Sequence, residues 1–219
     1  NLCWGKADPD ALLGLIRSLR VDAIGCQELG FEQAEAISEE LPYGILDPDD
    51  GPRGTGIALR LQAKCESHPM AYRDLHSAQL HPNDWEGLSA PFEFATTHLA
   101  APHVRPFGKG FWYRYNQVRD IERYLADQPR ERRALVGDFT ATPLWPVYRR
   151  IASQLTDAAV VVAQVRGTPL ASTWGPTATS PRLLRIDHAF IRGVDAVGFE
   201  VVEVPGSDHA AIVIDLSFD

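Results

Sequence analysis

The middle of this chain carries the sequence Leu135-Val136-Gly137-Asp138-Phe139-Thr140-Ala141-Thr142-Pro143. An apolar run leads into Gly137, and a carboxylate and a hydroxyl follow it two residues apart. If residues 134–136 form a buried strand, Asp138 lies at the carboxyl end of that strand, where α/β proteins form ligand clefts. Side chains at positions i and i+2 of a strand point the same way, so Asp138 and Thr140 could face one cleft.

The same residues also suit a plain strand-to-helix turn. Thr140 or Thr142 would then be the N-cap of a helix, and Pro143 would be its first residue. This stretch alone leaves both interpretations open, so the choice between them depends on the rest of the chain.

The composition is that of an ordinary globular protein with one sizeable core. The chain has 219 residues, of which 45% are hydrophobic and 23% are charged. Its formal net charge is -8, whereas a tight, non-specific binder of duplex nucleic acid usually carries a basic surplus. No apolar run approaches the roughly 18 residues of a membrane span. No signal peptide is recognisable, so the sequence leaves the compartment open.

Apolar spacing and turn residues predict helices and strands in mixed order. Helices are expected over residues 9–19, 31–41, 111–125 and 143–155, and a loop is expected over residues 47–54. Neighbouring strands are expected over residues 55–61 and 63–72, and further strands over 21–26, 92–99, 134–136, 184–191, 196–204 and 210–216. Several strands follow one another late in the chain, which favours an α/β (α+β) fold of two packed sheets with helices outside them.

Polar side chains stand where several of these strands end. They are Glu28, His98, Asp138 and the pair Asp208-His209, and Asp187 lies inside an otherwise apolar strand. Each has an ordinary explanation, such as a solvated turn, a core histidine, or an ion pair of Asp187 with Arg185 or Arg192. Taken together these explanations weaken, because clustering buried carboxylates is costly without a cation or a histidine partner.

Such a set of side chains suits the hydrolysis of a phosphate ester. Glu28, with Asp138 or Asp208 nearby, can offer oxygen ligands to Mg²⁺ or Mn²⁺, which prefer carboxylates and water. One histidine held by a carboxylate could orient or protonate a group, and a second could stabilise charge on the phosphate. No cysteine or histidine spacing indicates zinc, and the chain has neither a Walker-type loop nor a Gly-x-Ser-x-Gly elbow.

Seven short motifs, in order along nearly the whole chain, resemble those of the endonuclease/exonuclease/phosphatase superfamily, the deoxyribonuclease-like metal-dependent phosphoesterases. They are Asn1-Leu2-Cys3-Trp4, Gln27-Glu28, Gly54-Thr55-Gly56-Ile57-Ala58-Leu59, Thr97-His98-Leu99, Gly137-Asp138-Phe139-Thr140, Arg185-Ile186-Asp187-His188 and Ser207-Asp208-His209. The resemblance implies one domain over residues 1–219, built as a four-layer α/β/β/α sandwich with its cleft at one end of the two sheets.

The resemblance also implies a role for each matching residue. Glu28 and Asn1 would hold Mg²⁺ (or Mn²⁺) or the scissile phosphate, and Asp208 would join the metal side. Asp138 would orient or activate the attacking water. His209, held in its tautomer by a carboxylate, would contact the phosphate or assist proton transfer, and His98 with Asp187 would form a second histidine arm.

Two features depart from the family pattern. The family usually has asparagine where this chain has Thr140, and a hydroxyl is shorter than an amide. Thr140 can still donate to a phosphate oxygen or align the water, but loss of a well-placed donor could slow the reaction roughly a hundredfold. The second departure is that the family's first strand is nearly absent, so we expect Asn1 to be mobile.

The resemblance leaves the substrate open, because this fold serves DNA, RNA, nucleotides and lipids. A phosphodiesterase resembling a nuclease is the leading hypothesis, acting as a monomer on a phosphate ester, with nucleic acid among the candidates. A phosphomonoesterase, a phospholipid or sphingomyelin-type phosphodiesterase, and a binding module weakened by Thr140 are the alternatives. The candidate substrate contacts are Arg105 and Trp112, in and after the loop over residues 100–111, and Tyr72 with Arg73 at the end of the strand over residues 63–72. The loop could equally be a helix entry whose aromatic side chains dock on the core.

Overall fold

A computed structural model describes residues 1–102, 108–128 and 130–218. Its largest sheet has six strands in the order β4-β5-β6-β7-β9-β8. These strands are β4 (Lys64–His68), β5 (Leu75–Leu80), β6 (Phe92–His98), β7 (Arg133–Asp138), β8 (Thr156–Asp157) and β9 (Asp187–Arg192). Strands β6 and β7 are parallel and every other neighbouring pair is antiparallel, so the sheet is mixed.

A second layer of strands packs on this sheet in two separate pieces. One piece is the antiparallel sheet β1 (Ala23–Gln27), β3 (Thr55–Leu59) and β2 (Tyr43–Asp47), in the order β1-β3-β2. The other is the antiparallel pair β10 (Asp195–Glu203) and β11 (Ala210–Ser217). Between the layers, Ile57 and Leu59 meet Phe94 and Val136 in a shared apolar core.

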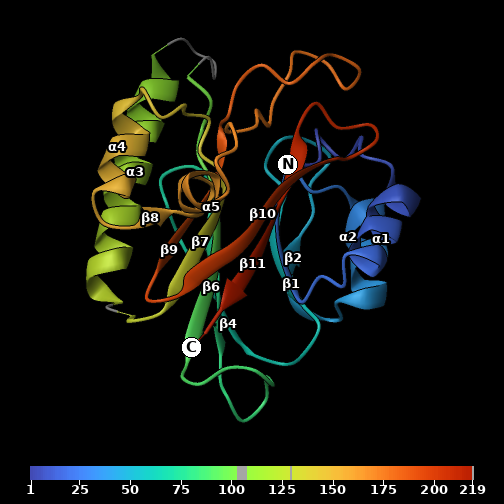
Figure 1. The fold of residues 1–219 in the computed structure, drawn as a ribbon. Coiled ribbons are helices and arrows are strands. Elements are labelled where there is room, and N and C mark those ends of the chain that lie inside the picture. The colour runs from blue at the N-terminus through green and yellow to red at the C-terminus, as the bar shows by residue number, and fades with distance from the viewer. Residues whose placement is uncertain (103–107, 129, 219) are drawn as a thin grey trace.

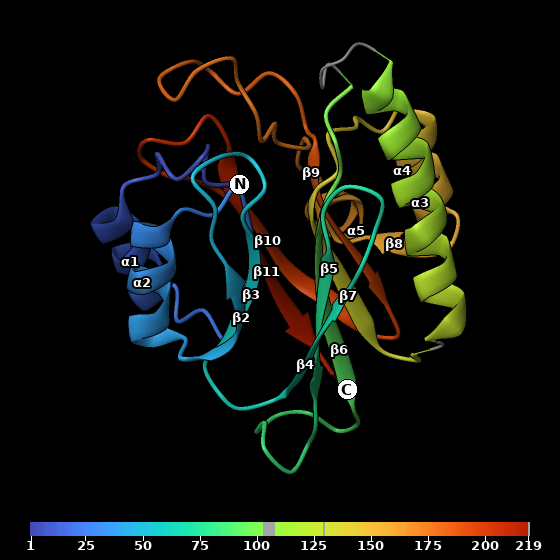
Figure 2. The same ribbon diagram turned by 180° about the vertical axis from the view of Figure 1, so that it is seen from behind.

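Helices flank the two layers of strands (Figures 1 and 2). Helices α1 (Pro9–Ser18) and α2 (Phe31–Glu40) pack on the β1-β3-β2 sheet through Leu12, Ile16 and Ile37. Helices α3 (Lys109–Asp127) and α4 (Pro146–Ala152) lie on the opposite flank and cover the six-stranded sheet. A short helix, α5 (Ala158–Arg166), packs against β9 and β10. Among the described helices, none combines the length and the apolar character that crossing a bilayer requires.

The central strand β7 forms as its sequence predicts. All six of its residues are buried, which fits a strand covered on both faces. Gly137 has φ of +140°, and a Cβ atom there would lie 2.0 Å from the carbonyl oxygen of Thr97 on β6. Only glycine therefore lets β7 approach β6 at this point and turn toward the loop that follows.

Several sequence expectations differ from the structure. Residues 43–47 form β2 and residues 75–80 form β5, where no strand was expected, and residues 158–166 form α5, which no pattern predicted. The strands expected as neighbours over 55–61 and 63–72 belong to different sheets, because the fully buried β3 pairs with β1 and β2 whereas β4 pairs with β5. Helix α4 begins at Pro146 instead of Pro143, since residues 140–145 hold the loop that leaves the site.

Candidate active site

The strand register of the six-stranded sheet brings three of the predicted side chains together. His98 at the end of β6 lies opposite Asp138 at the end of β7, and Asp138 lies opposite Asp187 at the start of β9. The strand pairing therefore places one histidine and two carboxylates side by side at one end of the sheet. All three side chains are almost completely buried.

Asp138 is the centre of the cluster. The side-chain amide of Asn1 donates to its Oδ2 atom at 3.0 Å, and the backbone N–H of Thr140 donates to its Oδ1 atom at 2.6 Å. The Nε2 atoms of His98 and His209 lie 3.5 and 3.8 Å from Oδ2. Burial raises the pKa of Asp138 and the nearby charge of Asp187 raises it further. A positive charge close to this carboxylate would therefore stabilise its ionised form.

His209 and Asp187 form a buried pair. The Nδ1 atom of His209 lies 2.9 Å from Oδ2 of Asp187, and the hydroxyl of Thr173 donates to the same oxygen at 2.5 Å. Burial by itself would lower the pKa of His209, but the charge and hydrogen bond of Asp187 outweigh burial and raise that pKa. The same contact lowers the pKa of Asp187 against the opposing effect of burial. The pairing of His98 with Asp187 that the sequence suggested is wrong, because β9 turns Asp187 toward His209.

Glu28 and His98 occupy the other side of Asp138. The Oε1 atom of Glu28 lies 3.9 Å from Nε2 of His98, and its Oε2 atom accepts the backbone N–H of Trp4 at 3.1 Å. Burial and then the charge of Asp138 raise the pKa of Glu28. Burial, with the charge of Arg73, holds the pKa of His98 well below its usual range, so this ring is neutral at pH 7.

The donor set of the site fits a divalent cation. Burial and the charge of Asp138 raise the pKa of Glu28, and in the described part of the chain neither carboxylate forms an ion pair with lysine or arginine. Ligand atoms of Asp138, Asp187 and His209 also lie within 4.8 Å of one another. The carboxylate of Asp208, by contrast, already accepts the indole N–H of Trp174 at 3.1 Å.

Comparison with known proteins identifies the group to which this arrangement belongs. The sequence profile of the Endonuclease/Exonuclease/phosphatase family matches residues 1–209. The chain belongs to this family. The protein is therefore a hydrolase of the family's phosphoesterase type, as its sequence motifs predicted. No curated protein sequence matches the chain.

Three solved structures show how closely the family fold is kept. The catalytic domain of human Nocturnin, with bound sulfate, has 21% identity and a TM-score of 0.73, covering 96% of this chain and 86% of that one. D. rerio TDP2 in complex with a single-strand DNA product has 18% identity and a TM-score of 0.69, covering 95% and 92%. A mannosyl-6-phosphatase from Bacteroides thetaiotaomicron has 16% identity and a TM-score of 0.68, covering 98% and 92%.

The position at which the chain departs from the family pattern has an unexpected neighbour. Thr140 has φ of +45°, and its hydroxyl accepts a hydrogen bond from the guanidinium of Arg114 on α3. That hydroxyl donates to the carbonyl oxygen of Ala100 at 3.2 Å, so its one hydrogen is used within the protein and not for a phosphate oxygen. Arg114 also donates to Ala100 O at 2.8 Å, lies over the ring of Trp145, and has a pKa that burial lowers to about 10.

Sequence reasoning missed Arg114, although a signal for it exists. Arg114 shares the buried face of α3 with Gln117, Val118 and Ile121, at helical spacing of three and four residues. An arginine in the apolar stripe of a helix is unusual and needs a buried partner. That stripe could therefore have indicated a charged site beneath α3.

The candidate substrate contacts have different positions. Arg73 is buried, donates to the carbonyl oxygens of Pro52 and Leu99, and stacks its guanidinium 4.6 Å from the ring of Tyr72. Trp112 is 58% exposed on the first turn of α3. Arg105 lies outside the described residues.

Proposed function

We propose that this protein hydrolyses phosphodiesters with Mg²⁺ (or Mn²⁺), in the manner of a nuclease. The observation that carries the proposal is the convergence of Asn1, His98 and His209 on the single carboxylate of Asp138. These residues come from four distant segments, so their meeting is not a consequence of local turn geometry. We also infer that the two strand layers and their flanking helices form the four-layer α/β/β/α sandwich that the family resemblance implied.

Glu28 and Asp138 would hold the divalent ion, with the Asn1 amide and Asp208 as the further groups that the family resemblance implies. When bound, it would neutralise charge on the phosphoryl group and on the leaving oxygen. The charge of Arg73 opposes the rise in the pKa of Glu28, but among the described residues no lysine or arginine forms an ion pair with Glu28 or Asp138, which supports a bound cation at these carboxylates.

The chain's own side chains supply positioning and proton transfer. Asp138 accepts a hydrogen bond from the attacking water and orients it toward phosphorus. Asp187 fixes the Nδ1–H tautomer of His209, so the Nε2 atom, which lies on the Asp138 side, faces the reacting group. His98 stays neutral and offers a hydrogen bond to a phosphate oxygen.

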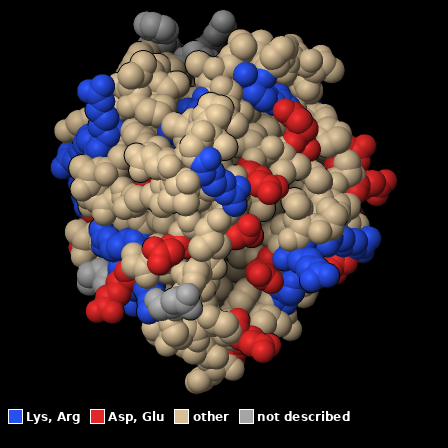
Figure 3. Space-filling model, viewed as in Figure 1, with Lys and Arg blue, Asp and Glu red and all other residues tan. Residues whose placement is uncertain are grey.

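The surface favours a substrate smaller than a long duplex. On the face shown in Figure 3, basic and acidic side chains are interspersed and do not gather into one basic band. The net charge of -8 agrees with this distribution. Single-stranded nucleic acid or a short phosphodiester, contacted by Tyr72, Arg73, Arg105 and Trp112, fits better, and the TDP2 complex with a single-strand product supports this class.

A phosphomonoester is the second candidate substrate, supported by the similar fold of the mannosyl-6-phosphatase. A binding module without turnover is the candidate from another class. It is supported by Thr140, whose hydroxyl hydrogen bonds to Ala100 O and so does not replace the family's amide.

The proposal is tested by paired assays on bis(p-nitrophenyl) phosphate and p-nitrophenyl phosphate with Mg²⁺, Mn²⁺ or EDTA. We expect metal-dependent cleavage of the diester, loss of activity in EDTA, and an inactive Asp138→Asn variant. The exposed Asp195→Asn variant is the matched control and should keep full activity. Faster cleavage of the monoester would favour the phosphatase, and no turnover with any divalent ion would favour the binding module. Plasmid, single-stranded DNA, RNA, phosphoinositides and sphingomyelin then define the substrate.

A further inference from the structure

Five large apolar side chains stand on the outer surface where α3 begins and where the chain enters α4. They are Phe111, Trp112, Tyr115, Leu144 and Trp145, and we call them the α3–α4 patch. Each is at least 38% exposed, and Leu144 is 78% exposed. Single exposed apolar residues are common, but a contiguous group of them marks an interaction surface.

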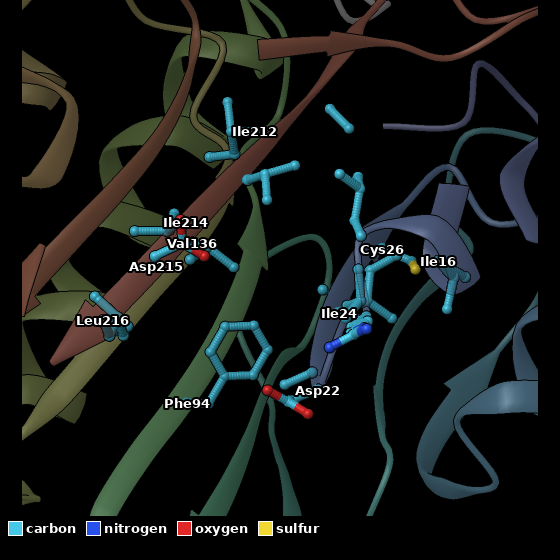
Figure 4. A pocket seen from close by; sticks show the side chains of 18 of the residues that line it. Ile16, Asp22, Ile24, Cys26, Phe94, Val136, Ile212, Ile214, Asp215 and Leu216 are labelled. Carbon is cyan, nitrogen blue, oxygen red and sulfur yellow. The ribbon is translucent and has the colours of Figure 1, made fainter. Parts of the chain in front are cut away.

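The patch differs from the other apolar surface of the molecule, which is internal. A space of about 660 Å³ between β1 and β11 is lined by apolar side chains, among them Ile24, Phe94 and Ile214 (Figure 4). That space lies among the strands of the second layer and belongs to the core of the fold. The α3–α4 patch faces outward from helices that cover the other face of the six-stranded sheet.

Contacts between the two helices make the patch continuous. Helices α3 and α4 lie side by side on one flank of the molecule (Figures 1 and 2). The Cζ atom of Arg150 on α4 lies 6.0 Å from the centre of the Tyr115 ring on α3, and that of Arg114 on α3 lies 5.2 Å from the centre of the Trp145 ring. Tyr115 follows Phe111 by one helical turn, so both lie on the same face of α3.

The surroundings of the patch are basic although the whole chain has a net charge of -8. Residues 109–119 and 144–152 include no aspartate or glutamate, and their basic residues are Lys109, Arg114, Arg119, Arg149 and Arg150. Among the described residues, only Arg150 of these five is paired with a carboxylate, that of Glu122. The charge of this surface therefore complements a partner that is anionic as well as apolar.

An anionic lipid surface combines these two properties. Aromatic and aliphatic side chains bury their apolar parts at the boundary between headgroups and acyl chains, while arginine and lysine keep their charge at the headgroups. The negative potential of such a surface attracts nearby basic residues. Single-stranded nucleic acid is also anionic, but it is held by stacking on rings, and Leu144, the most exposed member of the patch, has no ring.

The patch adjoins the candidate active site. Arg114, which lies over the Trp145 ring, also donates to the hydroxyl of Thr140, and the N–H of Thr140 donates to Asp138 Oδ1 at 2.6 Å. Leu144 and Trp145 end the loop that leaves the site after Asp138. A surface bound by the patch would therefore lie next to the site.

We propose that the α3–α4 patch binds this protein peripherally to an anionic phospholipid surface. Phe111 and Leu144 enter the boundary between headgroups and acyl chains, and Lys109, Arg119 and Arg149 meet the phosphates of the headgroups. This binding goes beyond the proposed hydrolysis, because it holds whichever phosphate ester is the substrate.

Sedimentation with vesicles in EDTA tests the proposal without turnover. Vesicles of phosphatidylcholine with about one third phosphatidylglycerol should bind the protein, and vesicles of phosphatidylcholine alone should bind it at least roughly tenfold more weakly. A double variant, Phe111→Ser with Leu144→Ser, should bind the mixed vesicles at least roughly tenfold more weakly. Arg119→Gln with Arg149→Gln should weaken binding at least roughly fivefold, and added salt should reduce the difference from the wild type.

The matched control is Phe31→Ser. Phe31 is 58% exposed on the first turn of α2, on the opposite flank, so this variant should bind the mixed vesicles as the wild type does. All variants change exposed side chains and should keep the Tm of the wild type. The Phe111→Ser, Leu144→Ser double variant should also cleave bis(p-nitrophenyl) phosphate, which is soluble, at the wild-type rate.

Four results would overturn the proposal. The first is absence of vesicle binding, and the second is equal vesicle binding by the wild type and the double variant. The third is oligothymidylate binding that the double variant loses while vesicles remain unbound, which would assign the patch to single-stranded nucleic acid. The fourth is a dimer that the double variant loses in sedimentation velocity without vesicle binding, which would assign the patch to a second copy of the chain. Because none of these readouts involves turnover, failure here is distinguishable from failure of the proposed hydrolysis.

Discussion

The buried pair of Asp187 and His209 offers the sharpest test of the site, through the substitution Asp187→Asn. Asp187 accepts from His209 Nδ1 at 2.9 Å and from the Thr173 hydroxyl at 2.5 Å. Asparagine keeps the shape of the side chain but carries no charge, and its amide nitrogen cannot accept a hydrogen bond. The substitution therefore removes the carboxylate that orients the ring while it leaves the packing of β9 nearly unchanged.

The size of the effect follows from the contact. A hydrogen bond between charged partners contributes roughly 1.5–3 kcal/mol. Since one pKa unit corresponds to about 1.36 kcal/mol, the pKa of His209 should fall by roughly one to two units. Loss of the orienting carboxylate should also reduce turnover by roughly 10²–10⁴-fold, the range set by catalytic histidines whose tautomer is no longer fixed.

The effect on stability depends on pH in a defined direction. The pKa of His209 is raised in the folded state, so its contribution is complete below the unfolded pKa and is lost as pH rises through the folded pKa. The pKa of Asp187 is lowered, so its contribution is present above the unfolded pKa and is lost as pH falls through the folded one. The difference in stability between the wild type and Asp187→Asn should therefore be largest between about pH 4 and 6.5, the unfolded values of the two groups.

Two measurements check these expectations. The pKa of His209 is read from the pH dependence of its ring C–H resonance, assigned with a His209→Gln variant. Thermal unfolding is then followed from pH 3 to 9 for the wild type, Asp187→Asn and the exposed control Asp195→Asn. An unchanged or higher pKa of His209 in the variant would refute the reasoning, as would a Tm difference that is the same at every pH.

Three further substitutions probe the metal site, the departure at Thr140 and the close approach of two strands. Glu28→Gln should weaken Mg²⁺ binding, measured by calorimetry, at least roughly tenfold. Mg²⁺ binding to the wild type should also weaken as pH falls, because the raised pKa of Glu28 lets protons compete with the ion. The exposed Glu32→Gln variant is the control, and equal Mg²⁺ affinities of Glu28→Gln and the wild type would contradict the assignment. Thr140→Asn should keep or raise both activity and Tm, since asparagine tolerates a φ of +45° better than a β-branched residue, and a large loss of activity would mean that Thr140 has its own role. Gly137→Ala should lower the free energy of unfolding by roughly 3 kcal/mol or more, because the new Cβ atom would lie 2.0 Å from the carbonyl oxygen of Thr97. The control is Gly14→Ala, whose Cβ atom would meet no atom within 4 Å, and thermal unfolding should show it to be neutral or stabilising.

Elements with strong local signals are the ones that the sequence predicted. Strand β7 has an apolar run that ends at a glycine, and α1 has Asp8 as its N-cap, accepting the N–H of Ala11 at 2.9 Å, with a proline in the first turn. Helix α5 has equally good ends, since Asp157 caps it and Gly167 closes it in the left-handed conformation. It was missed because its valine-rich interior has strand-like propensity, which packing against β9 and β10 overrides.

That Glu28, His98, Asp138 and His209 lie near one another was predictable, because these residues stand where predicted strands end or begin. The pairing of each histidine with a carboxylate within the site was not predictable. Whether Asp187 meets His98 or His209 depends on the strand order β6-β7-β9, which places Asp138 between His98 and Asp187. A sequence that shows where strands end does not show which strands are neighbours, so the wrong histidine was given to Asp187.

Helical spacing places Arg114 on the buried face of α3, but it does not show that Arg114 contacts Thr140. The motif places a hydroxyl at residue 140, and a hydroxyl could serve a phosphate oxygen. In the structure, Thr140 Oγ1 accepts a hydrogen bond from Arg114 and donates its one hydrogen to the carbonyl oxygen of Ala100. The guanidinium that contacts Thr140 comes from α3, 26 residues earlier in the sequence, and its Nη2 atom is buried without a hydrogen-bond partner among the described residues. The effect of threonine in place of asparagine at residue 140 therefore depends on Arg114, because the guanidinium donates a hydrogen bond to the Thr140 hydroxyl.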